Sequence, residues 1–205
     1  MRLTGIPLSR TPIVWRGTMR IALCFQPSRL SLAVLLLAAA LTTSAGAKSA
    51  ELPMQTASDP KGRFAIDFPA GWEVRTSEDG SPAVIGAGPG STSRPNVNVV
   101  LDTLPSPMSS EEFAQQSEPA LQAIFQDYTA LKEGPMRLAG LPAYYRYYTW
   151  RTNSGVSLYQ VQVYMAVAKR GFVVTGTTRN DADHLRTELP VIIRIINSFR
   201  PSSRR

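Results

Sequence analysis

The side chains best suited to chemistry lie near the carboxyl end of the chain, at Asp181, Asp183 and His184. His184 is the only histidine, so any Ser-His-Asp hydrolase built on this chain must use it, with one of the two aspartates as the acid. Neighbours on the first turn of a helix do not easily make that geometry, because the acid must orient the imidazole from its far side. The three side chains could also ligate a divalent cation, but their spacing matches no known metal-binding loop. We therefore interpret His184 as a solvated side chain beside a helix N-cap, and expect no catalytic residue and no metal site.

Two further patterns imitate functional motifs. Gly86–Ser91 (GAGPGS) suggests a phosphate cradle, but it lacks the G-K-[ST] ending and precedes a strand rather than a helix. Glu111 and Glu112 could be taken for paired catalytic carboxylates, yet Glu112 stands three residues after Ser109, which is the spacing of a capping box. We interpret the first pattern as a hairpin loop, and the two acids as groups that favour the start of a helix.

The aromatic segment Leu141–Arg151 (LPAYYRYYTWR) is the best candidate for a binding site. Strand alternation places Tyr144, Arg146, Tyr148 and Trp150 on one face. An arginine among aromatic rings can stack on a sugar, an aromatic ligand or a partner's side chain. The alternative is that these rings fill an interface between a sheet and a helix, since tyrosine is favoured in strands in any case. The sequence leaves both interpretations open.

The rest of the sequence predicts the elements that would position these side chains. Short turns join the last three strands, which indicates an antiparallel meander. The helices are too few for alternating βαβ units, so we predict an α+β fold in which helices flank an antiparallel β-sheet. The predicted strands cover 63–68, 72–74, 83–87, 96–104, a pair within 128–138 that divides near Gly134-Pro135, 141–151, 156–168 and 172–178; the predicted helices cover 109–125 and 180–199.

Both predicted helices contain a proline. Pro119 lies in the first helix, where its missing N–H and its ring predict a kink or a helix that restarts at this residue. Pro190 should kink the second helix for the same reason. Asn180 or Asp181 should be the N-cap of that second helix.

The amino-terminal 47 residues have the pattern of a cleavable signal peptide. Arg20 and Arg29 precede the apolar run Leu30–Leu41, and Ala45–Ala47 supplies a small-x-small cleavage site. A membrane-spanning helix needs about 20 apolar residues, more than this run provides. We therefore expect cleavage after Ala47, no retained membrane span, and a protein that works in the periplasm or is secreted.

The chain then divides into four parts. We assign residues 1–47 to the signal peptide, 48–60 to a polar linker, 61–200 to a single domain and 201–205 to a basic tail. Residues 1–18 read as an extension upstream of the signal, because Met19 begins a signal peptide of normal length. The sequence does not decide between Met1 and Met19 as the start.

Composition and charge exclude several classes of protein. The 205 residues are 43% hydrophobic and 18% charged, which argues against a disordered or coiled-coil protein. The formal charge of +7 falls to +2 after cleavage, because five arginines and no acidic residue precede the cut. The remaining charges are interspersed, so nothing indicates binding to nucleic acid. The only cysteine, Cys24, also precedes the cut, so we expect no disulfide, no thiolate site and no cofactor.

Several segments resemble the PsbP-like/DcrB superfamily over about residues 61–200. RFAIDFPAGWEV is similar to the aromatic strand, proline turn and tryptophan that open these domains. The helix after SSEEFA, the segment AGLPAYYRYY, the hairpin QVQVYMAVAKRGFVVTGTT and the closing helix that ends at Ile196–Arg200 follow in the same order. The resemblance implies an α/β/α sandwich and an exported, non-enzymatic accessory or binding role.

The same resemblance transfers no functional residue to this chain. Bacterial DcrB-type members are often lipid-anchored, and no cysteine follows the apolar run of this signal. Photosynthetic members use metal-binding histidines, and only His184 is present here.

These observations favour one function and leave two alternatives. We expect an exported, non-enzymatic protein that binds a protein or another component of the cell envelope. The first alternative is a carrier of a small apolar or aromatic ligand, in a pocket lined by Tyr144, Tyr148 and Trp150. The second is a hydrolase that uses His184. The sequence identifies neither the partner nor the oligomeric state.

Overall fold

The computed structural model describes residues 53–77, 82–90 and 94–202. The predicted signal peptide, with its upstream extension, lies outside these residues, as does the end of the predicted basic tail from residue 203. Within the described ranges, no helix is both long enough and apolar enough to cross a bilayer. The strands are β1 (Met54–Ser58), β2 (Phe64–Pro69), β3 (Glu73–Thr76), β4 (Val84–Ala87), β5 (Asn96–Thr103), β6 (Gln126–Leu138), β7 (Leu141–Arg151), β8 (Ser157–Val167), β9 (Arg170–Arg179) and β10 (Arg200–Pro201); the helices are α1 (Ser110–Ile124), α2 (Ala182–Thr187) and α3 (Leu189–Asn197).

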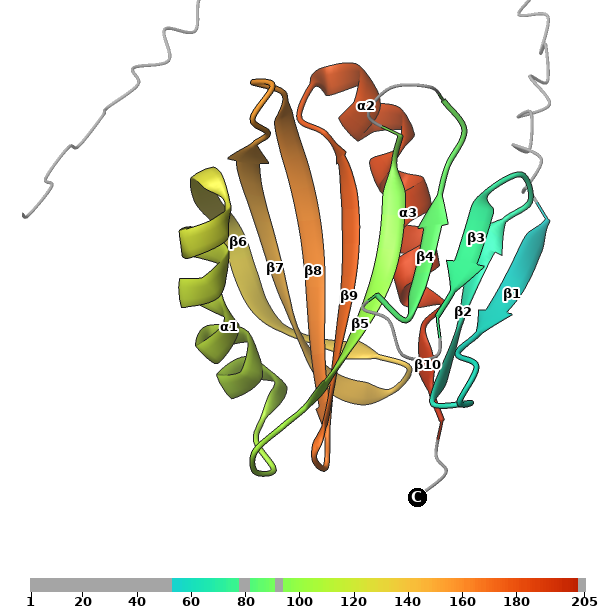
Figure 1. The fold of residues 1–205 in the computed structure, drawn as a ribbon, viewed down its shortest axis with the longest axis vertical. Helices are drawn as coiled ribbons and strands as arrows, with labels where there is room; N and C mark the ends of the chain where they lie inside the picture. The colour runs from blue at the N-terminus through green and yellow to red at the C-terminus, as the bar shows by residue number, and fades with distance from the viewer. Residues whose placement is uncertain (1–52, 78–81, 91–93, 203–205) are drawn as a thin grey trace, which may run out of the picture. The chain divides into compact units, whose positions relative to one another are not determined.

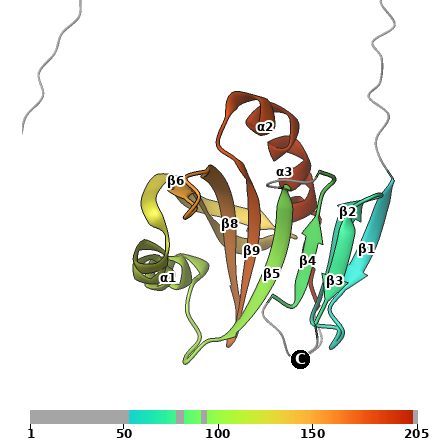
Figure 2. The same ribbon diagram turned by 45° about the horizontal axis from the view of Figure 1, so that its top comes forward.

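A seven-stranded antiparallel sheet in the order β3-β4-β5-β9-β8-β7-β6 forms the centre of the fold (Figure 1). Its last strands form the predicted meander, in which β7 pairs with β8 and β8 with β9. Helix α1 contacts β6, β7 and β8, whereas α3 contacts β5 and β9. Figure 2 shows that α1 and α3 lie on opposite sides of the sheet. The predicted α+β fold, an antiparallel sheet flanked by helices, is therefore confirmed.

A second, three-stranded sheet in the order β1-β2-β10 corrects the predicted linker at 48–60. Met54–Ser58 is a strand that pairs along the whole of Ala65–Pro69. The turn between β1 and β2 is held by Asp59, whose carboxylate accepts hydrogen bonds of 2.9 Å from the backbone N–H and of 2.6 and 2.7 Å from the guanidinium of Arg63. These hydrogen bonds lower the pKa of Asp59. The prediction missed β1 because an edge strand with the polar sequence MQTAS gives no alternating signal.

One prediction made from a glycine-proline pair was wrong, and one of the two outcomes predicted for Pro119 is excluded. Residues 128–138 are not a strand pair but part of the continuous strand β6, which pairs with β7 through two register shifts. Pro135 is tolerated there because β6 is an edge strand whose one neighbour in the sheet is β7. Its missing N–H therefore costs no hydrogen bond to a second neighbouring strand. Helix α1 runs through Pro119 without restarting.

The predicted closing helix is divided rather than kinked. Glu188 ends α2 and begins α3, and Pro190 stands in the first turn of α3. A proline is well placed at this position, because the N–H groups of a first turn have no partner within the helix. The predicted N-cap Asp181 is confirmed: its side chain accepts a hydrogen bond from the His184 N–H.

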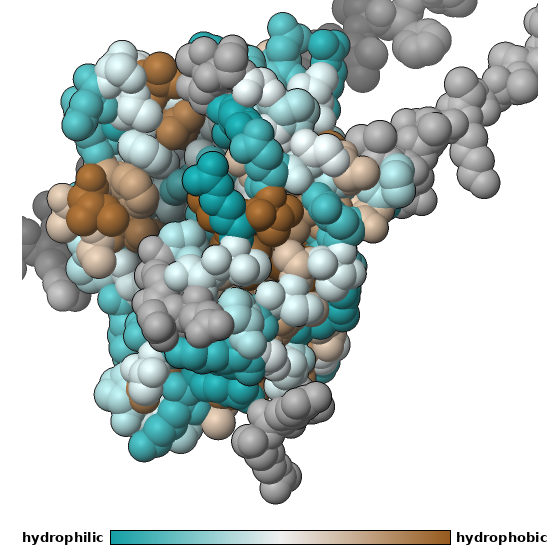
Figure 3. Space-filling view, turned by 45° about the vertical axis from the view of Figure 1, so that its right-hand side comes forward, coloured by the Kyte–Doolittle hydropathy of each residue, from teal (hydrophilic) through white to brown (hydrophobic). Residues whose placement is uncertain are grey.

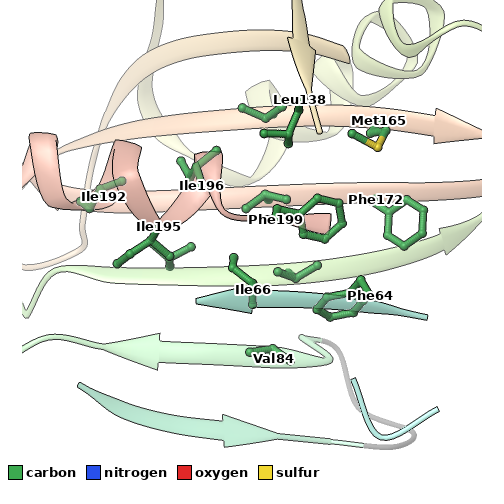
Figure 4. Packing of buried hydrophobic residues seen from close by; sticks show 14 of the residues in the cluster. Phe64, Ile66, Val84, Leu138, Met165, Phe172, Ile192, Ile195, Ile196 and Phe199 are labelled. Atoms are coloured by element: carbon green, nitrogen blue, oxygen red, sulfur yellow. The ribbon is translucent and has the colours of Figure 1, made fainter. Parts of the chain in front are cut away.

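The largest apolar cluster lies between α3, the β1-β2-β10 sheet and the central sheet (Figure 4). Ile192, Ile195 and Ile196 of α3 are at most 1% exposed. Phe64 and Phe199 pack with ring centroids 5.4 Å apart, which joins β2 to the end of α3. The strand predicted at 63–68 is therefore confirmed as β2, and its alternate residues Phe64, Ile66 and Phe68 are at most 1% exposed.

Gly176 makes the close contact of α3 with β9 possible. A Cβ atom at this position would overlap Ile192 Cγ2 and approach Ile196 Cδ1 to 3.3 Å. We expect Gly176→Ala to lower the free energy of unfolding by about 1–3 kcal/mol, since overpacking forces the helix away from the strand. Urea denaturation measures this loss.

A double mutant provides the control for this prediction. Ile192→Ala removes the methyl group with which the new Cβ would collide. The double mutant Gly176→Ala/Ile192→Ala should therefore lose less free energy of unfolding than the two single mutants lose together. Strict additivity would show that Gly176 does not set the spacing between α3 and β9.

Candidate functional site

The aromatic face of β7 is buried beneath α1. Tyr144, Arg146 and Tyr148 are 6%, 0% and 0% exposed, and Trp150 is half-buried. Phe125, which follows α1, lies with its ring centroid 5.9 Å from that of Tyr148 and 4.5 Å from that of Trp150. The structure thus brings the four predicted binding residues together, but inside the helix–sheet interface. We assign them a packing role.

Arg146 joins three elements through its guanidinium. Nε donates to Glu133 Oε2 of β6 at 2.7 Å, Nη1 to the Ala114 carbonyl of α1 at 3.1 Å, and Nη2 to Glu118 Oε2 of α1 at 3.2 Å. The guanidinium carbon also lies 5.9 Å from the centroid of the Tyr164 ring. Burial opposes the charge of Arg146, but the hydrogen bond to Glu133 and the neighbouring acidic groups outweigh it, so the pKa of Arg146 is raised. A charged, fully buried arginine therefore holds α1 against β7.

The first turn of α1 is fixed as well. The predicted capping box is present, with Glu112 N–H donating to Ser109 Oγ at 3.1 Å and Ser109 N–H to Glu112 Oε2 at 2.7 Å. The next residue, Ser110, donates to the Pro142 carbonyl and accepts from the Ala166 N–H, both at 3.1 Å. Helix α1 is thus attached to β7 and β8 at its start and, through Arg146, near its middle.

A groove of about 570 Å³ runs beside α1, where the helix leaves the same face of the sheet open over β9 and β5. This volume is in the range of ligand-binding sites. Its floor carries amide and hydroxyl side chains, among them Gln160, Gln162 and Thr175. Its helical wall carries aliphatic side chains, among them Leu121 and Ile124. The site therefore has a largely polar floor, interrupted by Val100 and Val173, beside a largely apolar helical wall, interrupted by Gln116 and Ser117.

The polar floor is an ordered array. Gln160 Nε2 donates to Thr177 Oγ1 at 2.8 Å, and Gln162 Nε2 donates to Thr175 Oγ1 at 3.2 Å. In both cases β8 and β9 are directly paired at these residues, so each bond is a cross-strand rung on the open face. Tyr164 OH donates to Gln162 Oε1 at 2.5 Å. The two rungs hold the glutamine amides in defined orientations.

One acceptor in this floor has no partner within the described part of the chain. Gln160 is 7% exposed, and its Oε1 is a buried atom without a hydrogen bond. Leaving such a group unpaired costs about 1–3 kcal/mol. Tyr148 OH and Trp150 Nε1, on neighbouring β7, are unpaired too, and burial raises the pKa of Tyr148. Of these atoms, only Gln160 Oε1 belongs to a residue that lines the groove.

The groove is almost uncharged. Asp102, at the carboxyl end of β5, is the one charged residue among the described residues that line it. Asp102 is exposed and pairs across the sheet with Gly171, which lies against Phe113 in the first turn of α1. The groove therefore suits a neutral ligand, with a single acid at the end nearest the start of the helix.

His184 lies away from this groove, at the first turn of the six-residue helix α2. Its Nδ1 is 2.7 Å from Asp181 Oδ1, and its hydrogen bonds to that carboxylate lower the pKa of Asp181. Asp183 instead accepts a 2.9 Å hydrogen bond from Arg186. Over the described ranges, no group of three acidic, histidine or cysteine side chains could hold a metal ion. Asp181, Asp183 and His184 therefore cap and stabilise the start of α2.

Exposed apolar side chains offer no broad alternative surface. Ile124, Leu131 and Leu141 are 69%, 52% and 38% exposed and come from three different elements. On the side of the molecule shown in Figure 3, apolar side chains form small separate areas between polar ones. Of the three exposed residues, only Ile124 borders the groove. At about 570 Å³, the groove is also larger than the hollow of about 280 Å³ beside Trp72 and Val191, and we take it as the candidate site on the described part of the chain.

Sequence reasoning did not find the groove floor. Its signal is present in the segment SLYQVQVYM, where Gln160 and Gln162 alternate with Val161 and Val163. Valines on one face of a strand indicate the core, and two glutamines on the other face indicate a polar surface, which in the structure lies at the bottom of the groove with Gln160 and Gln162 only 7% and 8% exposed. The alternation alone does not locate the groove, because its position also depends on how far α1 extends over this face of the sheet.

The comparisons with known proteins identify the family. The model of the DcrB family matches residues 65–194, which is more than half of the chain. The chain therefore belongs to the DcrB family, and the resemblance seen in the sequence is confirmed. A comparison with curated protein sequences finds no match.

Solved structures with low sequence identity share the fold. Cyanobacterial PsbP (CyanoP) from Synechocystis sp. PCC 6803 is 14% identical, covers 76% of this chain and 96% of its own, and has a TM-score of 0.54. LpqN of Mycobacterium tuberculosis, described as involved in cell envelope biogenesis, is 13% identical over 72% of this chain and 84% of its own, with a TM-score of 0.55. The Ran-binding protein Mog1p of Saccharomyces cerevisiae is 8% identical over 74% and 96%, with a TM-score of 0.50.

Replacing Arg146 should release α1. We expect Arg146→Met to lower the free energy of unfolding by about 3 kcal/mol, at the low end for a broken buried ion pair, because Glu118 and Glu133 can return to water. Amide hydrogen exchange should accelerate within α1 more than in β8. Urea denaturation and exchange measured by mass spectrometry test both effects.

Arg151 is the matched control on the same strand. Its side chain is 50% exposed and pairs with Asp127 at 3.2 Å, so Arg151→Met should change stability by less than about 1 kcal/mol. Equal losses for the two variants, or unchanged exchange in α1 of Arg146→Met, would contradict the proposed role of Arg146.

Proposed function

We propose that this chain is an exported, non-enzymatic accessory protein of the cell envelope, which binds a partner protein through the groove beside α1. The signal-peptide pattern of residues 1–47 supports export. Membership of the DcrB family, and the likeness to a protein involved in cell envelope biogenesis, support a role in the envelope. The likeness to a Ran-binding protein supports the use of this fold for protein binding.

The observation that carries the proposal is the groove itself. Its floor is part of a sheet and its wall is a helix attached at Ser110 and Arg146, so the site is held on regular elements. Among the described residues that line it are uncharged donors and acceptors and the single acid Asp102, but no nucleophile paired with a base, which suits binding rather than catalysis. A rigid, preformed site loses little conformational entropy when a partner binds.

The two alternatives gain no support from the structure. The carrier predicts a pocket lined by Tyr144, Tyr148 and Trp150, and these residues do not line the groove. The hydrolase needs a hydroxyl beside His184, and the hydrogen bonds of this ring within the described residues go to Asp181.

Site-specific photocrosslinking in cells tests the proposal. Gln116 is exposed and lines the groove, so a photoreactive amino acid at this position should crosslink to one dominant protein of the envelope fraction. Gln122, also exposed on α1, does not line the groove and bonds to Glu118. The same amino acid at position 122 should give no such product.

Two results would count against the proposal. Equal crosslinking from positions 116 and 122 would remove the groove as the contact surface. A protein that stays in the cytoplasm would remove the envelope role.

A further inference from the structure

We infer that the groove receives an extended, uncharged peptide segment of the partner, whose backbone amides pair with the side-chain amides of Gln160 and Gln162. This inference rests on the proposed function and specifies how that function is performed. It follows from the spacing of the floor, its unused hydrogen-bonding capacity, and the chemistry of the wall and of the groove end.

The spacing of the floor matches an extended chain. Gln160 and Gln162 are two residues apart on β8 and face the same side, which places them about 6.6 Å apart along the strand. An extended peptide presents its N–H and C=O groups to one side with the same two-residue period. A peptide lying along β8 and β9 would therefore meet one side-chain amide for every second residue.

The two amides have unused hydrogen-bonding capacity. Each glutamine side chain offers two N–H donors and an acceptor oxygen with two lone pairs. Gln160 uses one N–H, toward Thr177, and its Oε1 has no partner among the described residues. Gln162 uses one N–H, toward Thr175, and accepts one hydrogen bond, from Tyr164. Each amide thus has a free N–H and a free lone pair for a peptide, and because Gln160 and Gln162 are only 7% and 8% exposed, binding requires both amides to turn toward the groove.

The wall favours a peptide over a sugar. Ala120, Leu121 and Ile124 line it, and Ile124 is 69% exposed, so the wall offers aliphatic surface to apolar side chains. A sugar is best held by a flat, accessible aromatic ring. Of the aromatic rings that line the groove, Phe113 and Tyr164 are buried, and Phe125 is half-buried and packs against Tyr148 and Trp150.

The charge of the groove specifies the peptide further. Because Asp102 is the one charged residue among the described groove-lining residues, a peptide with a single lysine or arginine at the end near the start of α1 would bind better than an acidic one. The remaining positions should be uncharged, since the floor offers no counter-ion.

Selection of random linear heptapeptides, displayed on phage, against the purified protein tests this inference. The strongest binder is then synthesised with a fluorophore and its affinity measured by anisotropy. Gln160→Met and Gln162→Met, which keep side-chain volume but remove the amide, should each weaken binding about tenfold. Gln122→Met, on the outer surface of α1, should leave the affinity unchanged.

Methylation of the peptide backbone provides the readout specific to this geometry. N-methylation of one alternate set of peptide amides should weaken binding at least about tenfold, and N-methylation of the other set should have a small effect, because only one side of an extended chain faces the floor. The melting temperatures of Gln160→Met and Gln162→Met are the control for folding. If they match that of the unmodified protein, the weaker binding comes from a lost contact with the peptide.

Each remaining outcome overturns the inference. Failure to select any heptapeptide, or equal sensitivity to both methylated sets, would exclude the paired extended peptide. Binding to an array of neutral oligosaccharides instead, lost in Gln160→Met, would show that the ligand class is a glycan. In each of these cases a crosslink from position 116 but not 122 would leave the proposed function standing, whereas loss of that crosslink would overturn both.

Discussion

The structure depends on one buried cation, the guanidinium of Arg146. A single arginine without solvent contact would be too costly to bury, and here it is matched by two carboxylates and a helix carbonyl from β6 and α1. The carboxylates of Glu118 and Glu133 remain 30% and 40% exposed, so the ion pairs extend from the interior to the surface. This arrangement fixes the distance of α1 from the sheet, and that distance defines one wall of the groove.

The two faces of the central sheet are covered differently, and the difference creates the site. On one face, α3 and the β1-β2-β10 sheet bury a continuous apolar cluster over β5 and β9. On the other face, α1 lies mainly on β6, β7 and β8, and it reaches β9 at its first turn, where Phe113 meets Gly171. The sequence follows this division: Val97 and Val99 point to the covered face of β5, whereas Asn98 lines the groove. Polar side chains on β5, β8 and β9 thus line the part of this face that α1 leaves open.

The sequence was sufficient for the fold and insufficient for the site, for physical reasons. The strand at 63–68 and the capping box at Ser109 rest on local signals, and both were predicted correctly. The edge strand β1 was missed, because its polar sequence carries no strand signal and it forms through its pairing with β2. The alternation of β7 was also correct, but alternation cannot say which face a helix covers. That decision rests on Arg146 reaching Glu118, a contact between residues 28 positions apart.

The central claim is that the amide floor beside α1 is the surface that binds. The most direct measurement is an NMR titration of the ¹⁵N-labelled protein with its crosslinked partner, in which the side-chain amide resonances of Gln160 and Gln162 are followed. These resonances should shift, together with backbone amides of β9, while those of α3 stay in place. Shifts confined to α3 and the β1-β2-β10 sheet, with the two glutamine amides unchanged, would contradict this claim.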